Sequence, residues 1–197
     1  MYGGLSDRAA AVAWAAEMLR RRDVLFLDTE TTGLDGRAEI VEIAVVDARG
    51  RVLLDTLVRP LRPIPPDAQA IHGITDRMVA GAPMWPEVHA ELARLVRECP
   101  HVVVYNAAFD RRVIAQTARQ HCLPPPIAEW HCAMLQYAAY AGQRHPDTGG
   151  YRWHRLDRAA AALGVPRPTH RALGDALACR SVVAAMAGLG ERLAPRR

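Results

Sequence analysis

Lysine is absent from this sequence, and all 25 basic residues are arginine. The absence argues against aspartyl-phosphate phosphatases, which pair their nucleophilic aspartate with a lysine. The acidic pair Asp28-Thr29-Glu30 also has glutamate where those phosphatases carry a second aspartate. The net charge is +4 and the sequence pI is near 9.2. Arginine grips phosphates in a bidentate way, so this charge suits a phosphate-bearing partner, although a compositional bias toward Ala and Arg explains it equally well.

Long apolar runs are also missing. No stretch approaches the roughly 20 residues needed to span a bilayer. The first residues, Met1 to Gly4, lack the basic and apolar segments of an export signal. We therefore expect a soluble, cytoplasmic protein that does not bind membranes.

The four cysteines form no Cys-x-x-Cys pair, which favours free thiols in a reducing compartment. The adjacent pairs His121-Cys122 and His131-Cys132 invite a zinc interpretation. Their arrangement does not match the usual spacing of structural zinc ligands, so we do not expect a zinc site there.

The chain has 197 residues, half of them apolar, which is enough for one domain with a substantial core. We expect an N-terminal helix in residues 1–22 that packs on a single domain of residues 23–190, followed by a tail at 191–197. The helix itself should run from Asp7 to Arg22, because alanines fill this stretch and Ser6 can cap it.

The central feature is an apolar strand, Val24 to Leu27, that runs into Asp28-Thr29-Glu30. Side chains alternate along a strand, so the carboxylates of Asp28 and Glu30 should lie close together on one side. Two such anions persist if the site stays wet, if one is protonated, or if a cation lies between them. A strand end that simply runs into the polar turn Thr31 to Gly33 is the alternative.

Two more acids occupy comparable positions. Asp110 follows the predicted strand His101–Tyr105 at the start of a helix, and Asp175 opens the last long helix, predicted for Asp175–Leu189. A crossover should place the strand at 101–105 parallel to an earlier one, which brings Asp110 to the edge where open α/β sheets keep their sites.

The remaining elements follow from periodicity and turn signals. The prolines from Pro60 to Pro66 should exclude regular structure and form an extended connector. Residues 142–153 lack periodicity and should form a mobile loop. Elsewhere we predict strands at 40–46, 52–58 and 127–131 and helices at 75–78, 86–98, 109–121, 132–140 and 156–163.

The motifs Asp28–Gly33, Asn106–Asp110 and His170–Ala176, with Ile71–Thr75 between the first two, resemble those of the DnaQ-like 3′–5′ exonucleases. These form the histidine subtype of the DEDD family. The resemblance covers Val24 to Met186. It implies an α/β, ribonuclease H-like fold: a mixed central sheet of about five strands with helices on both faces.

The resemblance also implies the chemistry. Asp28, Glu30, Asp110 and Asp175 would hold two divalent cations, and an all-oxygen ligand set favours Mg²⁺ or Mn²⁺. His170 would act as the general base toward the attacking water, since an imidazole titrates near neutral pH. A surface histidine is its alternative interpretation. The products would be nucleoside 5′-monophosphates.

By the same resemblance, substrate binding falls to residues around the first motif and the segment near Ile71. The apolar members would sandwich the terminal base, although each could instead belong to the core. The family often has histidine where this chain has Tyr105, directly before Asn106. The predicted substrate-binding residues are Thr29, Thr31, Gly33, Leu34, Asp67, Ile71, His72 and Phe109.

The expected substrate is the 3′ end of single-stranded or mismatched DNA, with a DNA polymerase as a potential partner. Short RNA is the alternative substrate, because the motifs do not discriminate between sugars. A catalytically idle nucleic-acid-binding module is the other alternative. The presence of all five catalytic residues argues against it.

Overall fold

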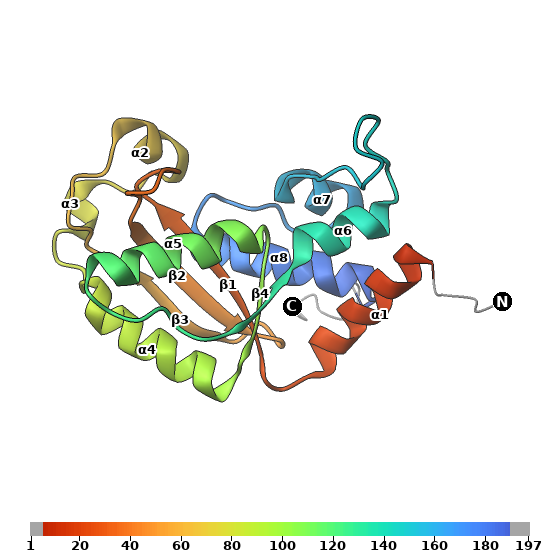
Figure 1. Ribbon diagram of the computed structural model, residues 1–197, viewed down its shortest axis with the longest axis horizontal. Coiled ribbons are helices and arrows are strands. Elements are labelled where there is room, and N and C mark those ends of the chain that lie inside the picture. The colour runs from red at the N-terminus through yellow and green to blue at the C-terminus, as the bar shows by residue number, and fades with distance from the viewer. Residues whose placement is uncertain (1–5, 190–197) are drawn as a thin grey trace, which may run out of the picture.

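The computed structural model describes residues 6–189, which form one five-stranded sheet with helices on both faces (Figure 1). The strand order is β3-β2-β1-β4-β5. β1 pairs antiparallel with β2 and parallel with β4, so the sheet is mixed. The strands are β1 (Val24–Thr31), β2 (Ile40–Asp47), β3 (Val52–Leu57), β4 (His101–Val104) and β5 (Glu129–Cys132).

Two sets of helices cover the sheet. α1, α6, α7 and α8 pack on one face, and α4 and α5 pack on the other. The helices are α1 (Asp7–Arg20), α2 (Pro66–His72), α3 (Asp76–Val79), α4 (Trp85–Glu98), α5 (Ala107–Gln120), α6 (Ala133–Ala141), α7 (Leu156–Leu163) and α8 (Ala172–Met186). The predicted α/β architecture, with a mixed sheet between two helical layers, is therefore confirmed.

The alternation of side chains along β1 positions the site. Phe26 packs in the core beneath α8, whereas Leu25 and Leu27 pack in the core beneath α4 and α5. Continuing this alternation places Asp28 and Glu30 on the α8 face and Thr29 on the α5 face. The polar residues at the end of β1 therefore face both helical layers.

One element was missed in the sequence. The prediction that the prolines exclude regular structure is wrong at Pro66, because a helix, α2, begins there. Proline is well tolerated in the first turn, where its missing N–H has no intrahelical partner. α2 ends at Gly73, whose φ of 72° closes the helix in the left-handed conformation. Asp67, Ile71 and His72 therefore lie on a helix rather than on an extended connector.

Several helix ends also differ from the prediction, and α8 ends at Met186 rather than at Leu189. α1 ends at Arg20, so Arg21 and Arg22 lie beyond it. α8 begins at Ala172, three residues before the predicted start, which places Asp175 in the first turn rather than at the opening of the helix. No helix within 6–189 combines the length and hydropathy needed to cross a membrane. The tail predicted for residues 191–197 lies outside the described part of the chain.

Candidate active site

Three carboxylates from two distant segments meet at the end of β1. Asp28 and Glu30 extend from the strand, and Asp175 extends from the first turn of α8, which packs over the same face. One carboxylate oxygen from each lies within 4.8 Å of the others. The predicted convergence of these acids is therefore seen in the structure.

Asp110 reaches the site from the opposite layer. It is buried in the first turn of α5, directly after β4. The Thr29 hydroxyl, on the α5 face of β1, donates a hydrogen bond of 2.9 Å to Asp110 Oδ1. Asp110 stands outside the group of three carboxylates, yet its charge acts on Asp28 and helps to raise the pKa of that group.

Burial and mutual repulsion raise the pKa values of the carboxyl groups in this site. Burial, reinforced by Asp110 and Asp175, raises the pKa of Asp28 well above its usual value. Burial together with Asp175 and Glu42 raises the pKa of Glu30 to about 8, and burial raises the pKa of Asp110 to about 7. Clustered oxygen anions of this kind fit a hard divalent cation, which relieves the repulsion that the protein alone leaves in place.

The loop before α8 is wrapped around Asp175. Asp175 Oδ1 accepts hydrogen bonds from the backbone N–H groups of Thr169 at 2.7 Å and His170 at 3.1 Å. His170 adopts a left-handed conformation with φ of 54°, and its side chain is exposed. Its charge acts on Asp175 and lowers the pKa of that carboxyl, against the larger effect of burial. The imidazole thus lies beside the cluster without a hydrogen bond that would fix it.

The ion pair between Glu42 and Arg171, which anchors this loop, was not predicted from the sequence. Glu42 is buried on β2 directly opposite Glu30 and accepts hydrogen bonds of 3.0 Å from Arg171 Nε to both its oxygens. It also accepts a hydrogen bond of 2.8 Å from the Ala172 N–H, at the start of α8. The pair joins β2 to the helix that carries Asp175. The available signal was a glutamate within the otherwise apolar run Ile40–Val46.

A groove of about 700 Å³ opens beside the carboxylates. Glu30 forms part of its wall, which links the groove to the cluster. All eight predicted substrate-binding residues line this groove: Thr29, Thr31, Gly33, Leu34, Asp67, Ile71, His72 and Phe109. The structure therefore brings these residues together, while their contacts with a substrate stay a prediction.

Apolar side chains stand on both rims of the groove. Leu34 is 77% exposed and Ile71 is 63% exposed. Arg112 steadies the first rim, because it donates to the Leu34 carbonyl at 3.1 Å and lies 5.4 Å from the centroid of the Phe109 ring. Arg62, which also lines the groove, is held by the buried Glu39 at 2.9 Å. Neither Arg112 nor Arg62 was predicted from the sequence to lie at the site.

His72 and Tyr105 both make contacts within the chain. His72 Nδ1 accepts a hydrogen bond from the Ile74 N–H at 2.9 Å, which leaves Nε2 to donate to the Thr31 carbonyl at 3.3 Å. His72 thereby ties α2 to the end of β1. The Tyr105 hydroxyl donates to the His154 carbonyl at 2.9 Å, away from the groove residues. Tyr105 thus holds the segment that precedes α7.

Close packing at Gly174 fixes the loop that bonds Asp175. A Cβ at Gly174 would lie 2.2 Å from Thr169 Oγ1. We expect Gly174→Ala to displace this loop, to destabilise the fold by about 1–3 kcal/mol and to lower turnover at least ~10-fold. Thermal melting and steady-state kinetics measure the two effects. Gly81→Ala is the matched control, because nothing lies within 4 Å of its added Cβ. Equal turnover in the two variants would contradict the role of the loop.

Comparison with known sequences adds to this geometry. Residues 25–183 match a family model described as exonuclease. An uncharacterized exonuclease of Escherichia phage 186 is 42% identical over 191 residues, which cover 93% of this chain and 97% of the phage protein. Exodeoxyribonuclease 10 of Escherichia coli K12 is 38% identical over 141 residues, or 66% of this chain and 54% of that enzyme. The match thus spans about half the length of the E. coli enzyme.

Solved structures agree with the sequence matches. Exonuclease X in complex with 5′ overhanging duplex DNA is 34% identical with a TM-score of 0.56, over 84% of this chain and 93% of that one. E. coli exonuclease I, solved in a zinc-bound complex with single-stranded DNA, has a TM-score of 0.69 over 86% of this chain and 41% of its own. Its identity is 20%, so this second likeness concerns the fold alone.

Proposed function

Because this chain belongs to the RNase T family of exonucleases, we propose that it hydrolyses phosphodiester bonds stepwise from the 3′ end of a nucleic-acid strand. The DnaQ-like kinship and the ribonuclease H-like fold expected from the motifs are confirmed. The observation that carries the proposal is the meeting of Asp28, Glu30 and Asp175 beside a groove wide enough for a nucleotide.

The carboxylates would hold divalent cations. We assign Asp28, Glu30, Asp110 and Asp175 as the residues that bind two ions, with Mg²⁺ or Mn²⁺ preferred because every donor is an oxygen. Bound there, the ions would stabilise the negative charge that develops on the phosphate oxygens during the displacement. The pKa values of Glu30 and Asp110, raised chiefly by burial, support this assignment, since a bound cation would offset the cost of burying these charges.

The side chains around the cluster have separate tasks. His170, exposed and beside Asp175, accepts the proton of the attacking water as general base. The backbone between Thr29 and Leu34 lines the groove and holds the terminal sugar. Leu34 and Ile71, exposed on the two rims, stack with Phe109 against the last base, a contact that tolerates any sequence. This arrangement selects a free strand end over an internal bond.

DNA is the favoured substrate. The related exonuclease X was solved with 5′ overhanging duplex DNA, and the structurally similar exonuclease I with single-stranded DNA. We therefore propose single-stranded or mismatched 3′ ends as the substrate. Short RNA stays the alternative, because no groove residue is singled out as a reader of the ribose hydroxyl. A polymerase partner likewise stays a prediction.

The decisive experiment follows the order in which nucleotides are released. An oligonucleotide labelled at its 3′ end should lose the label as a mononucleotide at once. The same strand labelled at its 5′ end should shorten one residue at a time. Both reactions should need Mg²⁺ or Mn²⁺ and stop in chelator. Release of internal fragments, or of the 5′ label first, would reject the proposal. Rates on single-stranded DNA, a 3′-mismatched duplex and RNA then identify the substrate.

A further inference from the structure

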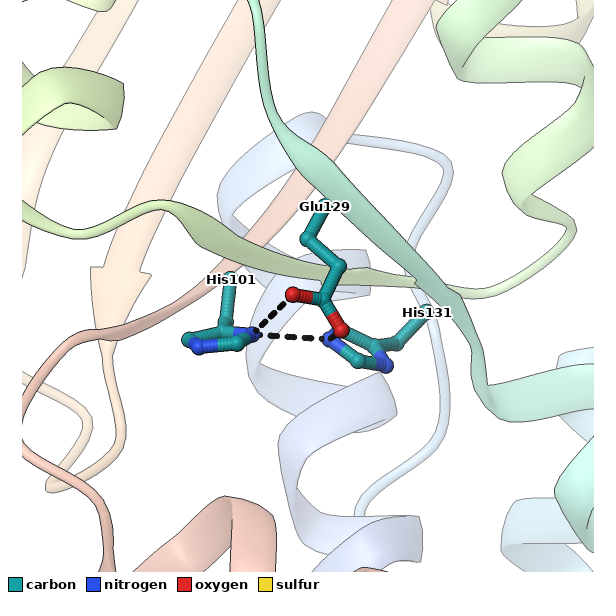
Figure 2. A group of neighbouring side chains, drawn as sticks. All are labelled: His101, Glu129 and His131. Carbon is teal, nitrogen blue, oxygen red and sulfur yellow. Dashed lines mark hydrogen bonds and ion pairs between the residues drawn. The ribbon is translucent and has the colours of Figure 1, made fainter.

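A second group of potential metal ligands lies at the opposite end of the sheet (Figure 2). His101 begins β4 and pairs with Val24, the first residue of β1, whereas the carboxylate cluster lies at the end of β1. His101 stands opposite Glu129 on β5. Glu129 and His131 are two residues apart and therefore project from the same face of β5 as neighbours of His101. Strand register alone thus brings the three side chains together.

The three side chains converge at the separation that a metal ion requires. His101 Nδ1 lies 3.1 Å from His131 Nε2 and 3.3 Å from Glu129 Oε2, while His131 Nε2 lies 3.5 Å from Glu129 Oε1. Ligand atoms at ~2.0–2.1 Å from a tetrahedral zinc ion are ~3.3–3.4 Å apart. The three separations, two of which involve different oxygens of Glu129, are close to this value, so a small rotation of the carboxylate brings one oxygen and the two nitrogens around a single ion.

Hydrogen bonds within this group join it only in part. With two neutral imidazoles, the facing nitrogens share a single proton, while the Glu129 carboxylate, which is 63% exposed, is open to water. A divalent cation satisfies both nitrogen lone pairs and the carboxylate at once. Two neutral imidazoles and one carboxylate form a ligand set suited to zinc and similar transition metals, in contrast to the all-oxygen set around Asp28.

The surroundings resemble the second layer of a metal site. His101 Nε2 lies 3.7 Å from Asp23 Oδ2, and a carboxylate behind a ligating histidine fixes its ring and strengthens it as a ligand. Arg21 holds Asp23 through bonds of 2.9 and 2.7 Å and also contacts His101 Nε2. A metal ion on Nδ1 leaves the ring proton on Nε2, so Arg21 must turn away from this nitrogen when the ion binds. The Glu129 side chain is 63% exposed, whereas both histidines are largely covered. One side of the group is thus open to water as a further ligand.

We propose that His101, Glu129 and His131 bind one zinc-type divalent transition-metal ion, separately from the ions of the active site. The site joins β4 to β5, which is the edge strand of the sheet and pairs with β4 alone. A bound ion stabilises this edge, because it binds the folded chain in preference to the unfolded one. From the sequence, His131 was considered as a zinc ligand only together with Cys132 and the pair His121-Cys122. The partner that matters, His101, comes from the adjacent strand.

The test is titration of the full chain with Co²⁺ in excess Mg²⁺, which occupies the all-oxygen cluster. The wild-type protein should bind one ion with the visible absorption of tetrahedral nitrogen and oxygen coordination, and Zn²⁺ should displace it. His131→Gln and Glu129→Gln should each weaken binding ~100-fold or more, since even outer-shell changes cost 10–100-fold. Asp23→Asn should weaken it about 10-fold. His145→Gln, a change at a partly exposed histidine in the loop between α6 and α7, should leave it unchanged.

A second measurement guards against misfolded variants. Glu129 is exposed, so Glu129→Gln should keep the fold and the exonuclease activity. Zn²⁺ should raise the melting temperature of the wild type and not that of Glu129→Gln. The proposal is overturned if the wild type takes up no Co²⁺ in excess Mg²⁺, or if both Gln variants bind it as tightly as the wild type does.

Discussion

Asp28→Asn is expected to lower exonuclease turnover at least ~1,000-fold while it raises the melting temperature of the metal-free protein by about 3 °C or more. Turnover falls because the amide cannot supply the charge that holds the cations between the carboxylates. Stability rises because Asp28 is the group on which burial and the charges of Asp110, Asp175 and Glu30 converge. Removing its charge relieves this repulsion.

The same charges predict a pH dependence of metal-free stability. Glu30, with a folded pKa of about 8, and Asp110, with about 7, both titrate near 4 in an unfolded chain. The folded chain therefore binds more protons, and its stability falls as pH rises from about 4 to 8. Added Mg²⁺ should abolish most of this fall. Asp28→Asn should flatten it, because the Asp28 carboxyl, whose pKa is also raised, no longer titrates.

Melting curves in chelator between pH 5 and 8.5, recorded with and without Mg²⁺, measure both effects. Asp147→Asn is the matched control, because that carboxylate is 85% exposed and lies in the loop after α6. It should leave turnover and the pH profile unchanged. A metal-free wild type that becomes more stable up to pH 8 would show that the carboxylates have countercharges of another origin.

His170→Ala is expected to lower turnover ~100-fold with little change in the Mg²⁺ concentration needed for half-maximal rate. Only the backbone N–H of His170 contacts Asp175, so the substitution spares the cluster. Asparagine enters the left-handed conformation readily, and His170→Asn therefore removes the imidazole without straining the backbone at φ of 54°. The two variants should lose turnover equally, and free imidazole in the buffer should restore part of it.

His145→Ala provides the control for this second prediction, since this partly exposed histidine lies in the loop that joins α6 and α7 and does not line the groove. It should keep full turnover. Wild-type turnover in His170→Asn would remove the imidazole from the reaction. A large rise in the Mg²⁺ requirement of both variants would instead assign His170 to the organisation of the cluster.

The acid positions could be predicted because they depend on local rules. Alternation along a strand places Asp28 and Glu30 together, and a crossover to a parallel strand brings Asp110 to the same edge. Asp175 followed from its position at the start of a helix, although the helix begins earlier, at Ala172. Most of the sheet follows from the same rules, since apolar runs bounded by turn residues mark β1, β2 and β3.

The missed features depend on pairing between segments that are distant in sequence. Glu42 meets Arg171 because β2 and the start of α8 flank the same end of β1. His101 meets His131 through strand register. In both pairs, the residues next to each partner in the sequence give no sign of the contact. Hydrophobic periodicity therefore cannot predict either pair. α2 was missed for a local reason. Pro66, which starts the helix, follows several prolines that indicate irregular structure.

The order of the elements along the chain also sets when the enzyme can act. Asp28 and Glu30 leave the ribosome early, whereas Asp175 leaves with α8, after every strand of the sheet. Until α8 emerges, the nascent chain lacks one member of the carboxylate group and the helix that covers its face of β1. The carboxylate group is therefore complete only after α8 has been synthesised and has folded over β1.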